Sequence, residues 1–536
     1  MLFEADQLPL SRRELLRRVG LAAGGGVMYQ AMTSLGLAAE SPYRGPIDLR
    51  GAPPGASVLI LGAGMAGMTA AFELRNAGYK VQVLEYNARA GGRNWTLRGG
   101  DRYTELGGLS QHCEFDAGLY INPGPWRIPY HHRGILSYCK RLGVALEPFV
   151  QVNYNAFLHS TDAFGGKPQR FREVKADFQG QIAELLAKAT QQNALDVLVA
   201  KEDQERLLES LRGWGALEHD YRYASGDASS ERRGYSKPPG GGLSARPAAG
   251  EPAKLADILK SGLWRSVASG DHYDMQTALF QPVGGMGRIG EAFGRELGGV
   301  IRYHAKVTAI EQDDKGVTVR FVDTSKGNLA QTARADWCLC TIPLPILAEI
   351  PMNVGADLGE AIGAVPYASA VKAGLQFKRR FWEEDEHIYG GISYTDLPIT
   401  NIGYPSTGFQ SSGKGVLLGA YIWGLNAMEF TSMTPQERVQ KVLEYGSQIH
   451  PQYHKEFDTG VAVAWHRVPF TQGCYGMWTA EARARHYDTL CTIDGRIALA
   501  GEHASFIGGW QEGAVTSALD AIGRLHQRAT AQGAKA

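Results

Sequence analysis

Three apolar runs near the start of the chain predict a strand, a helix and a second strand. Residues 57–61 are apolar after Ser57, residues 68–76 are mostly apolar over nine positions, and residues 80–84 alternate in polarity. Short runs with β-branched residues predict strands, whereas the longer stretch predicts a helix. This order predicts a parallel sheet, because parallel neighbours need a crossover connection.

Similar patterns predict further elements toward the carboxyl terminus. Helices are expected at residues 136–142, 178–198, 288–297 and 512–526, and strands at 300–310, 317–322 and 497–500. Residues 201–251 are polar and broken by Lys237-Pro-Pro-Gly-Gly-Gly242, which predicts a partly mobile insertion or lid. The first strand and the last strand–helix unit therefore belong to one domain that is discontinuous in sequence.

Composition excludes several classes of protein. The 536 residues carry 55 basic and 55 acidic side chains, so the formal net charge is zero. This balance gives no indication of nucleic-acid binding. Six scattered cysteines, without a CxxC pair, argue against a zinc ribbon or a disulfide scaffold. No stretch has the roughly 20 continuous apolar residues of a membrane-spanning helix. The length predicts about two intertwined domains.

The first 39 residues resemble an export signal. Ser11-Arg12-Arg13-Glu14-Leu15-Leu16 precedes a weakly hydrophobic, Gly- and Ala-rich segment at residues 19–39, which is similar to a twin-arginine signal. That route carries folded proteins and predicts a periplasmic or external location. The alternative is a basic amphipathic helix that stays on a cytoplasmic protein.

The turn between the first strand and the helix contains a dinucleotide-binding fingerprint. Gly62 permits a tight turn, Gly64 lets backbone amides approach a pyrophosphate, and Gly67 lets the helix pack close to the strand. The helix N-terminus presents unpaired N–H groups to the phosphates. Glu85, at the end of the second strand, is placed to bind both ribose hydroxyls. The motif predicts an ADP-containing dinucleotide.

Six motifs in order give the chain a family resemblance. They are the fingerprint with Glu85, Ala90-Gly-Gly-Arg93, Glu105-Leu-Gly-Gly108, Gln281-Pro-Val-Gly-Gly-Met286, Ala500-Gly-Glu502 and Gly509-Trp510-Gln-Glu-Gly513. With them the chain resembles the flavin-dependent amine oxidase family, most closely its L-amino acid oxidase branch, over residues 57–527. No second dinucleotide fingerprint is present, which argues against an NADPH-fed monooxygenase.

The resemblance implies an α/β fold with a discontinuous Rossmann-like FAD-binding domain of the amine-oxidase type. A mixed sheet-plus-helix substrate-binding domain and a helical insertion complete the expected architecture. The expected divisions are a signal segment at 1–39, a linker at 40–56, an FAD-binding domain at 57–135, 278–345 and 466–536, a helical lid and substrate region at 136–277, and a substrate-binding domain at 346–465.

The resemblance implies FAD as cofactor and assigns residues to it. Arg93 is expected to face the flavin nucleotide, Glu502 to meet the ribityl–pyrophosphate region, and Val307 to hold adenine by its main chain. The full expected cofactor set is Gly62, Gly64, Ala66, Gly67, Glu85, Gly92, Arg93, Gly107, Gly108, Trp126, Arg127, Val307, Gly501, Glu502, Trp510, Gln511 and Ala514.

The segment Gly124-Pro-Trp-Arg127-Ile-Pro129 is similar to the stretch that carries the carboxylate-binding arginine of L-amino acid oxidases. A guanidinium pairs bidentately with a carboxylate and stays charged at any working pH. The alternative is an arginine that holds a FAD phosphate or a structural Asp. The resemblance places Tyr421 as a second carboxylate contact. The strand at 415–421 matches the family only with one extra residue, and the alternative is a tyrosine that packs in the core.

The resemblance also supplies catalytic candidates. Lys372, in an apolar strand-like run, is similar to the family's lysine that holds a water near the flavin; the alternative is a surface lysine on an edge strand. Tyr475 and Trp510 are expected to form two aromatic walls, with Gly509 and Trp510 receiving the amino group. Cys474 resembles the cysteine that binds FAD covalently in monoamine oxidases, but the L-amino acid oxidase branch favours a non-covalent cofactor.

The implied reaction is FAD-dependent oxidative deamination of an L-amino acid by oxygen to the 2-oxo acid, ammonia and hydrogen peroxide. An aromatic or long side chain is the expected preference. No general base stands out, although His131, His132 and His503 are candidates. Rival hypotheses are a monoamine or polyamine oxidase, a quinone-linked dehydrogenase, an arginine or lysine oxidase, and a non-enzymatic flavin-binding protein. A homodimer is expected from the family.

Overall fold

A five-stranded parallel sheet forms the centre of the nucleotide-binding part. The computed structural model describes residues 41–194, 200–243 and 246–533; the expected signal segment lies outside them. The strand order is β12 (Ile301–Arg302), β2 (Lys80–Leu84), β1 (Ser57–Leu61), β16 (Trp337–Cys340) and β22 (Ile497–Leu499). All four pairings are parallel, as the strand–helix–strand order predicts.

Alternation along β1 divides the core of this part into two layers. Val58 and Ile60 pack with α2 (Met65–Asn76), α9 (Gly287–Leu297) and α17 (Gln511–Gly533) on one face. Leu59 and Leu61 face the other side, because successive strand residues point to opposite faces. That second face is covered by a three-stranded antiparallel sheet of β13 (Ala305–Asp313), β14 (Gly316–Asp323) and β15 (Leu329–Ala335).

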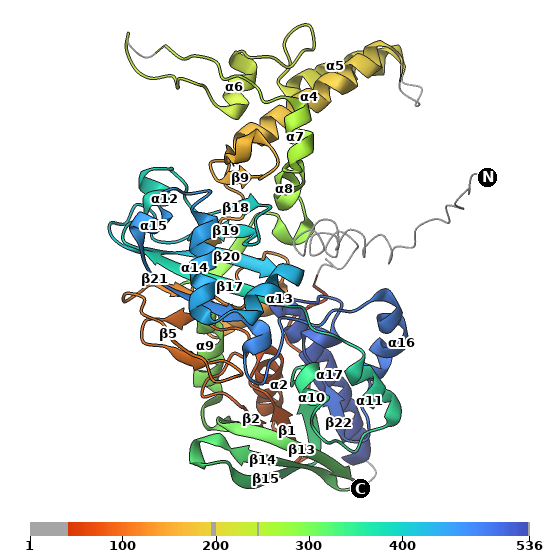
Figure 1. Ribbon diagram of the computed structural model, residues 1–536. Coiled ribbons are helices and arrows are strands. Elements are labelled where there is room, and N and C mark those ends of the chain that lie inside the picture. Colours follow the sequence, from red (N-terminus) through yellow and green to blue (C-terminus); the bar gives the residue numbers. More distant parts are fainter. Residues whose placement is uncertain (1–40, 195–199, 244–245, 534–536) are drawn as a thin grey trace, which may run out of the picture.

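A seven-stranded sheet forms a second part beside the first (Figure 1). In order across the sheet its strands are β10 (Gln169–Arg170), β9 (Phe157–His159), β18 (Ile392–Thr395), β19 (Asn401–Gly403), β20 (Gly415–Trp423), β17 (Ala370–Phe377) and β21 (Phe457–Ala464). Helices α13 (Gly424–Ser432) and α14 (Pro435–Gly446) pack on it. Thr434 and Glu437 form a capping box that begins α14.

Helices between β10 and β11 form an arm that projects from the molecule (Figure 1). It contains α4 (Phe171–Gln191), α5 (Lys201–Gly215), α6 (Asp227–Arg233), α7 (Leu255–Ser261) and α8 (Trp264–Val267). Buried Asp177 of α4 accepts hydrogen bonds from Arg233, Tyr223 and the Ala253 amide, which ties the helices together. The polar region predicted as a partly mobile lid is thus substantially helical, because α5 packs along α4.

A small sheet of β7 (Ile128–Pro129), β11 (Leu279–Pro282) and β8 (Leu146–Phe149) lies where the arm joins the body. Short hairpin-like pairs join β3 (Leu97–Arg98) to β6 (Tyr120–Ile121) and β4 (Arg102–Thr104) to β5 (Ser110–His112). The remaining helices are α3 (Arg133–Arg141), α10 (Leu344–Leu347), α11 (Ala356–Gly363), α12 (Phe381–Glu384), α15 (Tyr453–Glu456) and α16 (Ala480–Cys491). No helix of the described residues is long and apolar enough to cross a membrane.

The expected domain boundaries need two corrections. Helix α3 crosses the boundary drawn at residue 135, and its Ile135 and Tyr138 pack in the nucleotide-binding core. Strands β9 and β10 pair with the seven-stranded sheet, although the sequence placed them in the lid region. Both segments contact elements that are distant in sequence, so local patterns could not assign them.

Candidate active site

One cavity joins the two sheets at the carboxyl ends of the parallel strands. Gly62, Glu85, Thr341 and Gly501, which follow four neighbouring strands, all line it. Ligands of open parallel sheets bind at this edge. The cavity extends from these strand ends to aromatic residues of the second sheet, Tyr421 and Trp423.

The fingerprint glycines differ in the space around them. A Cβ on Gly67 would lie 2.0 Å from the Gly62 carbonyl oxygen, so only glycine lets α2 pack this close. A Cβ on Gly64 meets no atom within 4 Å and would project into open space. Gly62 has φ +102°, which an L side chain rarely adopts. The backbone therefore leaves a cradle at Gly64 that fits a pyrophosphate.

Glu85 is buried at the end of β2 and lines the cavity. Its carboxylate accepts the Ala63 amide at 2.7 Å and the Asn87 amide at 2.8 Å, which fixes its position. Carboxylate oxygens have further lone pairs for ribose hydroxyls. Beside it, the rings of Tyr86 and Phe470 stack 4.7 Å apart and also line the cavity.

Arg93 and Glu502 cross-link the middle of the cavity. Arg93 donates to Glu502 at 2.8 Å and to the Cys474 carbonyl at 2.6 Å. Glu502 also accepts the Gly476 amide at 3.1 Å and the Gly509 amide at 3.2 Å. This pair joins segments that lie 409 residues apart in the sequence. Ala66, Gly92, Val307, Gly501, Gln511 and Ala514 of the expected cofactor set line the same cavity.

Aromatic rings line the other end. Tyr421, Trp423, Trp465, Tyr475 and Trp510 all border the cavity. The Tyr421 and Trp423 rings lie 4.5 Å apart, and Trp423 meets Tyr475 edge-on at 5.9 Å. A Cβ on Gly509 would be 3.5 Å from the Tyr475 ring, so this glycine lies against that wall. Faces of electron-rich rings favour a cationic or polar amino group.

Lys372 lies directly behind this aromatic end. It is buried in the middle of β17, not on an edge strand, and pairs across the sheet with Tyr421. Its Nζ donates to the Gly124 carbonyl at 2.5 Å. No carboxylate pairs with it among the described residues, and burial lowers the pKa of Lys372 to about 7. Lys372 therefore changes its charge near neutral pH.

Arg127 is a buried guanidinium beside the aromatic end, but it does not itself line the cavity, unlike the other expected cofactor residues there. Its Nε donates to the Met275 sulfur at 3.1 Å, and its Cζ lies 5.9 Å from the Trp510 ring centroid. In the part of the chain that the structure describes, no carboxylate pairs with it. A buried charge without a counter-ion is costly unless a ligand supplies one. The alternative of a structural Asp partner therefore finds no support among the described residues.

The histidine candidates lie outside the cavity. Burial lowers the pKa of His503 to about 4, and its Nδ1 lies 2.9 Å from the Tyr367 hydroxyl. Burial, with a smaller effect of His131, lowers the pKa of His132 to about 3. None of the three histidines lines the cavity.

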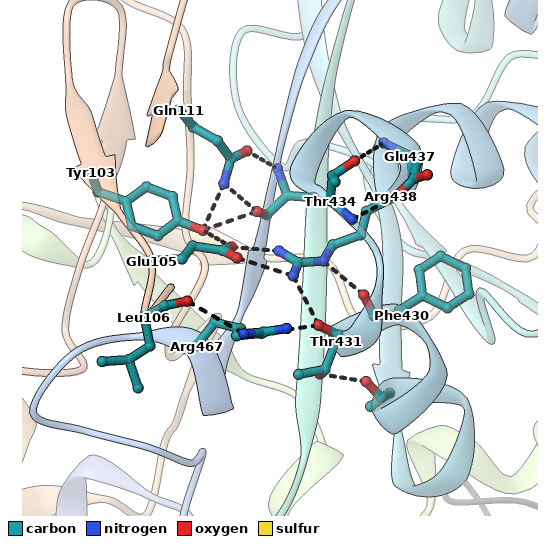
Figure 2. Close-up of polar contacts among 12 residues, drawn as sticks. Tyr103, Glu105, Leu106, Gln111, Phe430, Thr431, Thr434, Glu437, Arg438 and Arg467 are labelled. Atoms are coloured by element: carbon teal, nitrogen blue, oxygen red, sulfur yellow. Dashed lines mark hydrogen bonds and ion pairs between the residues drawn. The ribbon is translucent and has the colours of Figure 1, made fainter. Parts of the chain in front are cut away.

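Gly107 and Gly108 do not reach the cavity, which corrects their expected place in the cofactor set. The Glu105-Leu-Gly-Gly108 motif forms the exposed turn of the β4–β5 hairpin. Glu105 is instead buried against Arg438 of α14, whose Nε donates to the Phe430 carbonyl at 2.7 Å (Figure 2). A short motif match cannot tell this hairpin turn from a flavin-binding turn.

Trp126 is also not where the resemblance implied. Its ring borders a separate pocket beside Gly403. A Cβ added to Gly403 would lie 2.2 Å from the Trp126 ring, so a larger residue would not fit there. Its neighbours Gly124 and Pro125 line the cofactor cavity instead. Sequence reasoning did not identify the Tyr86–Phe470 stack, Trp423 or Trp465 as lining residues. The only available indication was that they are aromatic residues close to recognised motifs.

Comparisons with known proteins identify relatives of this chain. The family model of the flavin containing amine oxidoreductases matches residues 65–525. L-amino-acid oxidases of Siganus canaliculatus and Mus musculus are each 29% identical, over 88% of this chain and 85% and 70% of their own lengths. That of Daboia russelii is 28% identical over 87% of this chain and 88% of its own.

Solved structures show the same fold at low identity. Cyclohexylamine oxidase from Brevibacterium oxydans superposes with a TM-score of 0.58 at 17% identity, covering 89% of this chain and 99% of that one. Putrescine oxidase bound to putrescine gives 0.55 at 17% identity, with the same coverage. The expected α/β fold of the amine-oxidase type is confirmed.

Proposed function

The chain belongs to the flavin-containing amine oxidoreductase family, and from this premise we propose that it is an FAD-dependent L-amino-acid oxidase. It converts an L-amino acid, oxygen and water into a 2-oxo acid, ammonia and hydrogen peroxide. Relatives named as L-amino-acid oxidases match it over most of its length.

Arg127 carries the choice of an amino acid over an amine. Its guanidinium is buried, lies within reach of the aromatic end of the cavity, and has no carboxylate partner among the described residues. An α-carboxylate supplies that partner and pairs bidentately. An amine substrate would leave the charge uncompensated.

The residues of the cavity fit FAD. The open space at Gly64, the carboxylate of Glu85 and the helix N-terminus of α2 fit the pyrophosphate and ribose of an ADP moiety. FAD bound by these residues would supply the two-electron acceptor for the hydride that leaves the substrate Cα, and a route for those electrons to oxygen.

Five side chains orient the substrate and accept its proton. Arg127 and the Tyr421 hydroxyl hold the carboxylate, and the ring faces of Tyr475 and Trp510, beside Gly509, receive the amino group. The amine must lose a proton before it is oxidised. Lys372 does not itself line the cavity, so in its neutral form, with its lowered pKa, it takes up that proton at Nζ through a bridging water.

The lining of the cavity supports aromatic or long apolar side chains. Five aromatic residues border its substrate end: Tyr421, Trp423, Trp465, Tyr475 and Trp510. Among the described lining residues the acidic ones are Glu85 and Glu502, and Glu502 is already paired with Arg93. A basic substrate side chain would find no unpaired carboxylate there, which disfavours an arginine or lysine oxidase.

Anaerobic reduction tests this function directly. The purified flavoprotein is mixed with L-amino acids, their D-enantiomers and the matching amines, and the loss of flavin absorbance is followed. Bleaching by aromatic or long-chain L-amino acids alone supports the proposal. Bleaching by amines such as phenylethylamine would instead assign an amine oxidase.

Admitting air then identifies the electron acceptor. Stoichiometric peroxide on reoxidation supports an oxidase. Slow reoxidation in air, together with fast reoxidation by a soluble quinone, would assign a dehydrogenase. No bleaching by any amino compound would leave only flavin binding without catalysis.

Export by the twin-arginine route is part of the proposal. It rests on Ser11-Arg12-Arg13 and the weakly hydrophobic segment that follows. Cell fractionation of the Arg12→Lys, Arg13→Lys variant is expected to retain the protein in the cytoplasm, whereas an unchanged distribution would refute the signal. We also propose a homodimer, which light scattering of the purified protein tests.

A further inference from the structure

His131, His132 and Asp274 form a buried cluster outside the cavity. Their side chains are 3%, 1% and 2% exposed. One potential ligand atom of each lies within 4.8 Å of the others. His131 Nε2 is 3.3 Å from Asp274 Oδ1, about the separation of two ligand atoms in a tetrahedral zinc site.

The polar atoms of this cluster lack hydrogen bonds. Both nitrogens of His131, Nε2 of His132 and both carboxylate oxygens of Asp274 have no hydrogen-bond partner among the described residues. Buried polar atoms are almost always paired, so such a group at one place indicates a missing ligand. The ring of Tyr273 stacks on His131 at 4.3 Å and closes one side.

The charge balance favours a divalent cation. A second buried carboxylate, Glu512, interacts electrostatically with His131 and accepts the Gly134 and Ile135 amides, each at 2.8 Å. Carboxylate oxygens beside imidazole nitrogens are ligands for a metal cation rather than for an anion.

We propose that His131, His132 and Asp274 bind one zinc ion, with a fourth position open to water. Two imidazoles and one carboxylate are a common zinc ligand set. Bringing all three atoms to bonding distance needs shifts of about 1 Å from the present positions. The site is separate from the FAD cavity and does not depend on the proposed reaction.

Rigid elements hold the ligands. His131 and His132 follow β7, and Asp274 precedes β11 in the short helix η4 (Tyr273–Met275). β7 pairs with β11, and the Tyr130 amide donates to the Ala278 carbonyl at 3.1 Å. The ion thus fastens the base of the helical arm to the body. It also fixes Met275, whose sulfur accepts a hydrogen bond from Arg127.

Metal analysis of the full-length flavoprotein tests the site. The protein is reconstituted with zinc chloride, desalted and measured by inductively coupled plasma mass spectrometry. One zinc per chain is expected. The variants Asp274→Asn and His131→Gln are expected to lose it, with zinc affinity falling about tenfold or more. His272→Ala, a partly exposed histidine two residues from Asp274, is the matched control and keeps its zinc.

Flavin absorbance and circular dichroism show whether each variant is folded. Cobalt substitution of the wild-type protein gives a second readout that needs no variant, because tetrahedral Co²⁺ has intense visible d–d bands. Zinc well below one per chain after reconstitution would overturn the proposal, as would an octahedral cobalt spectrum. Full zinc retention by folded Asp274→Asn would place the ion elsewhere and overturn it equally.

Discussion

The Nζ of Lys372 lies 4.1 Å from the centroid of the Tyr421 ring, across the pairing of β17 with β20. The two residues are direct cross-strand neighbours, so the sheet register alone brings the buried amine to the tyrosine that borders the substrate end of the cavity. Because the ring and the Gly124 carbonyl shield Nζ from water, its charge state is sensitive to pH near neutrality.

We predict that kcat/KM rises as pH increases through about 7, because the active form of Lys372 is neutral. Lys372→Met removes this step and lowers kcat by about 100-fold. Tyr421→Phe keeps the titrating lysine and serves as the control that retains the step. Stopped-flow flavin reduction over pH 5–9 is the measurement; an unchanged profile in Lys372→Met would exclude this role.

The same lowered pKa predicts a stability effect. Between pH about 7 and the unfolded pKa of roughly 10.4, the unfolded chain binds one more proton at Lys372 than the folded chain. The free energy of unfolding therefore increases as pH rises through that window. Below pH 7 Lys372 is charged in both states, and the full cost of burying that charge destabilises the folded protein. Denaturant unfolding of the wild type and Lys372→Met at pH 6 and 9 should differ in this direction.

Gly64 and Gly67 should respond oppositely to an added methyl group. Gly64→Ala points into open space, so the apoprotein keeps its stability but binds FAD more weakly, since the methyl occupies the pyrophosphate cradle. Gly67→Ala meets the Gly62 carbonyl and should unfold more easily. Fluorescence titration with FAD and thermal unfolding of the apoprotein distinguish the two. Equal FAD affinity in Gly64→Ala would contradict the cradle.

Removing the Arg127 guanidinium should raise KM for L-amino acids. A buried carboxylate contact of this kind is worth about 2–5 kcal/mol, or about 30- to 5,000-fold in binding. Arg127→Met keeps most of the side-chain volume, and FAD should stay bound. Exposed Arg102→Met is the control. A KM within error of the wild type would reject the clamp.

Glu105 and Arg438 form an ion pair that is almost fully buried (Figure 2). Arg438→Met leaves the carboxylate without its partner and should destabilise the protein by about 3–5 kcal/mol, while the double variant with Glu105→Leu recovers much of this. The exposed pair Arg485–Glu360 is the control, and Arg485→Met should cost within about 1 kcal/mol. Thermal unfolding measures both. FAD affinity should stay unchanged at temperatures where the variants are folded. A loss of FAD affinity would show that the Glu105 motif contributes to the cofactor site.

Cys474 lines the cavity, but burial raises the pKa of its thiol to about 12. The thiolate is the nucleophile, so the side chain is poorly reactive at neutral pH. We predict that acid precipitation releases all FAD into the supernatant and that Cys474→Ser behaves identically. Flavin that remains with the precipitated wild-type chain, and not with Cys474→Ser, would establish a covalent link.

Local patterns predicted the elements with regular periodicity. The helix expected at 68–76 is α2 (Met65–Asn76), and that expected at 288–297 is α9 (Gly287–Leu297). Apolar spacing also predicted β14 and β22, because each buries one or both faces in a core. Helix ends were missed by a few residues, since capping depends on neighbours that the pattern does not contain.

Many residues that line the cavity could also be predicted, because they lie in short motifs whose backbone geometry is local. Glu105-Leu-Gly-Gly108 and Trp126 were misplaced for the opposite reason. Whether a residue faces a cavity or another part of the protein depends on what packs against it. Arg438 packs against Glu105, and Gly403 packs against Trp126.

The sequence by itself determined the βαβ unit, the dinucleotide fingerprint and the family, since these depend on residue spacing within short segments. Only the tertiary structure decided that Lys372 lies behind Tyr421, that Arg127 has no carboxylate partner among the described residues, and that His131 meets Asp274. Those relationships arise where strands and loops far apart in the chain pack together, and burial then sets which charges are paired and which protons are held.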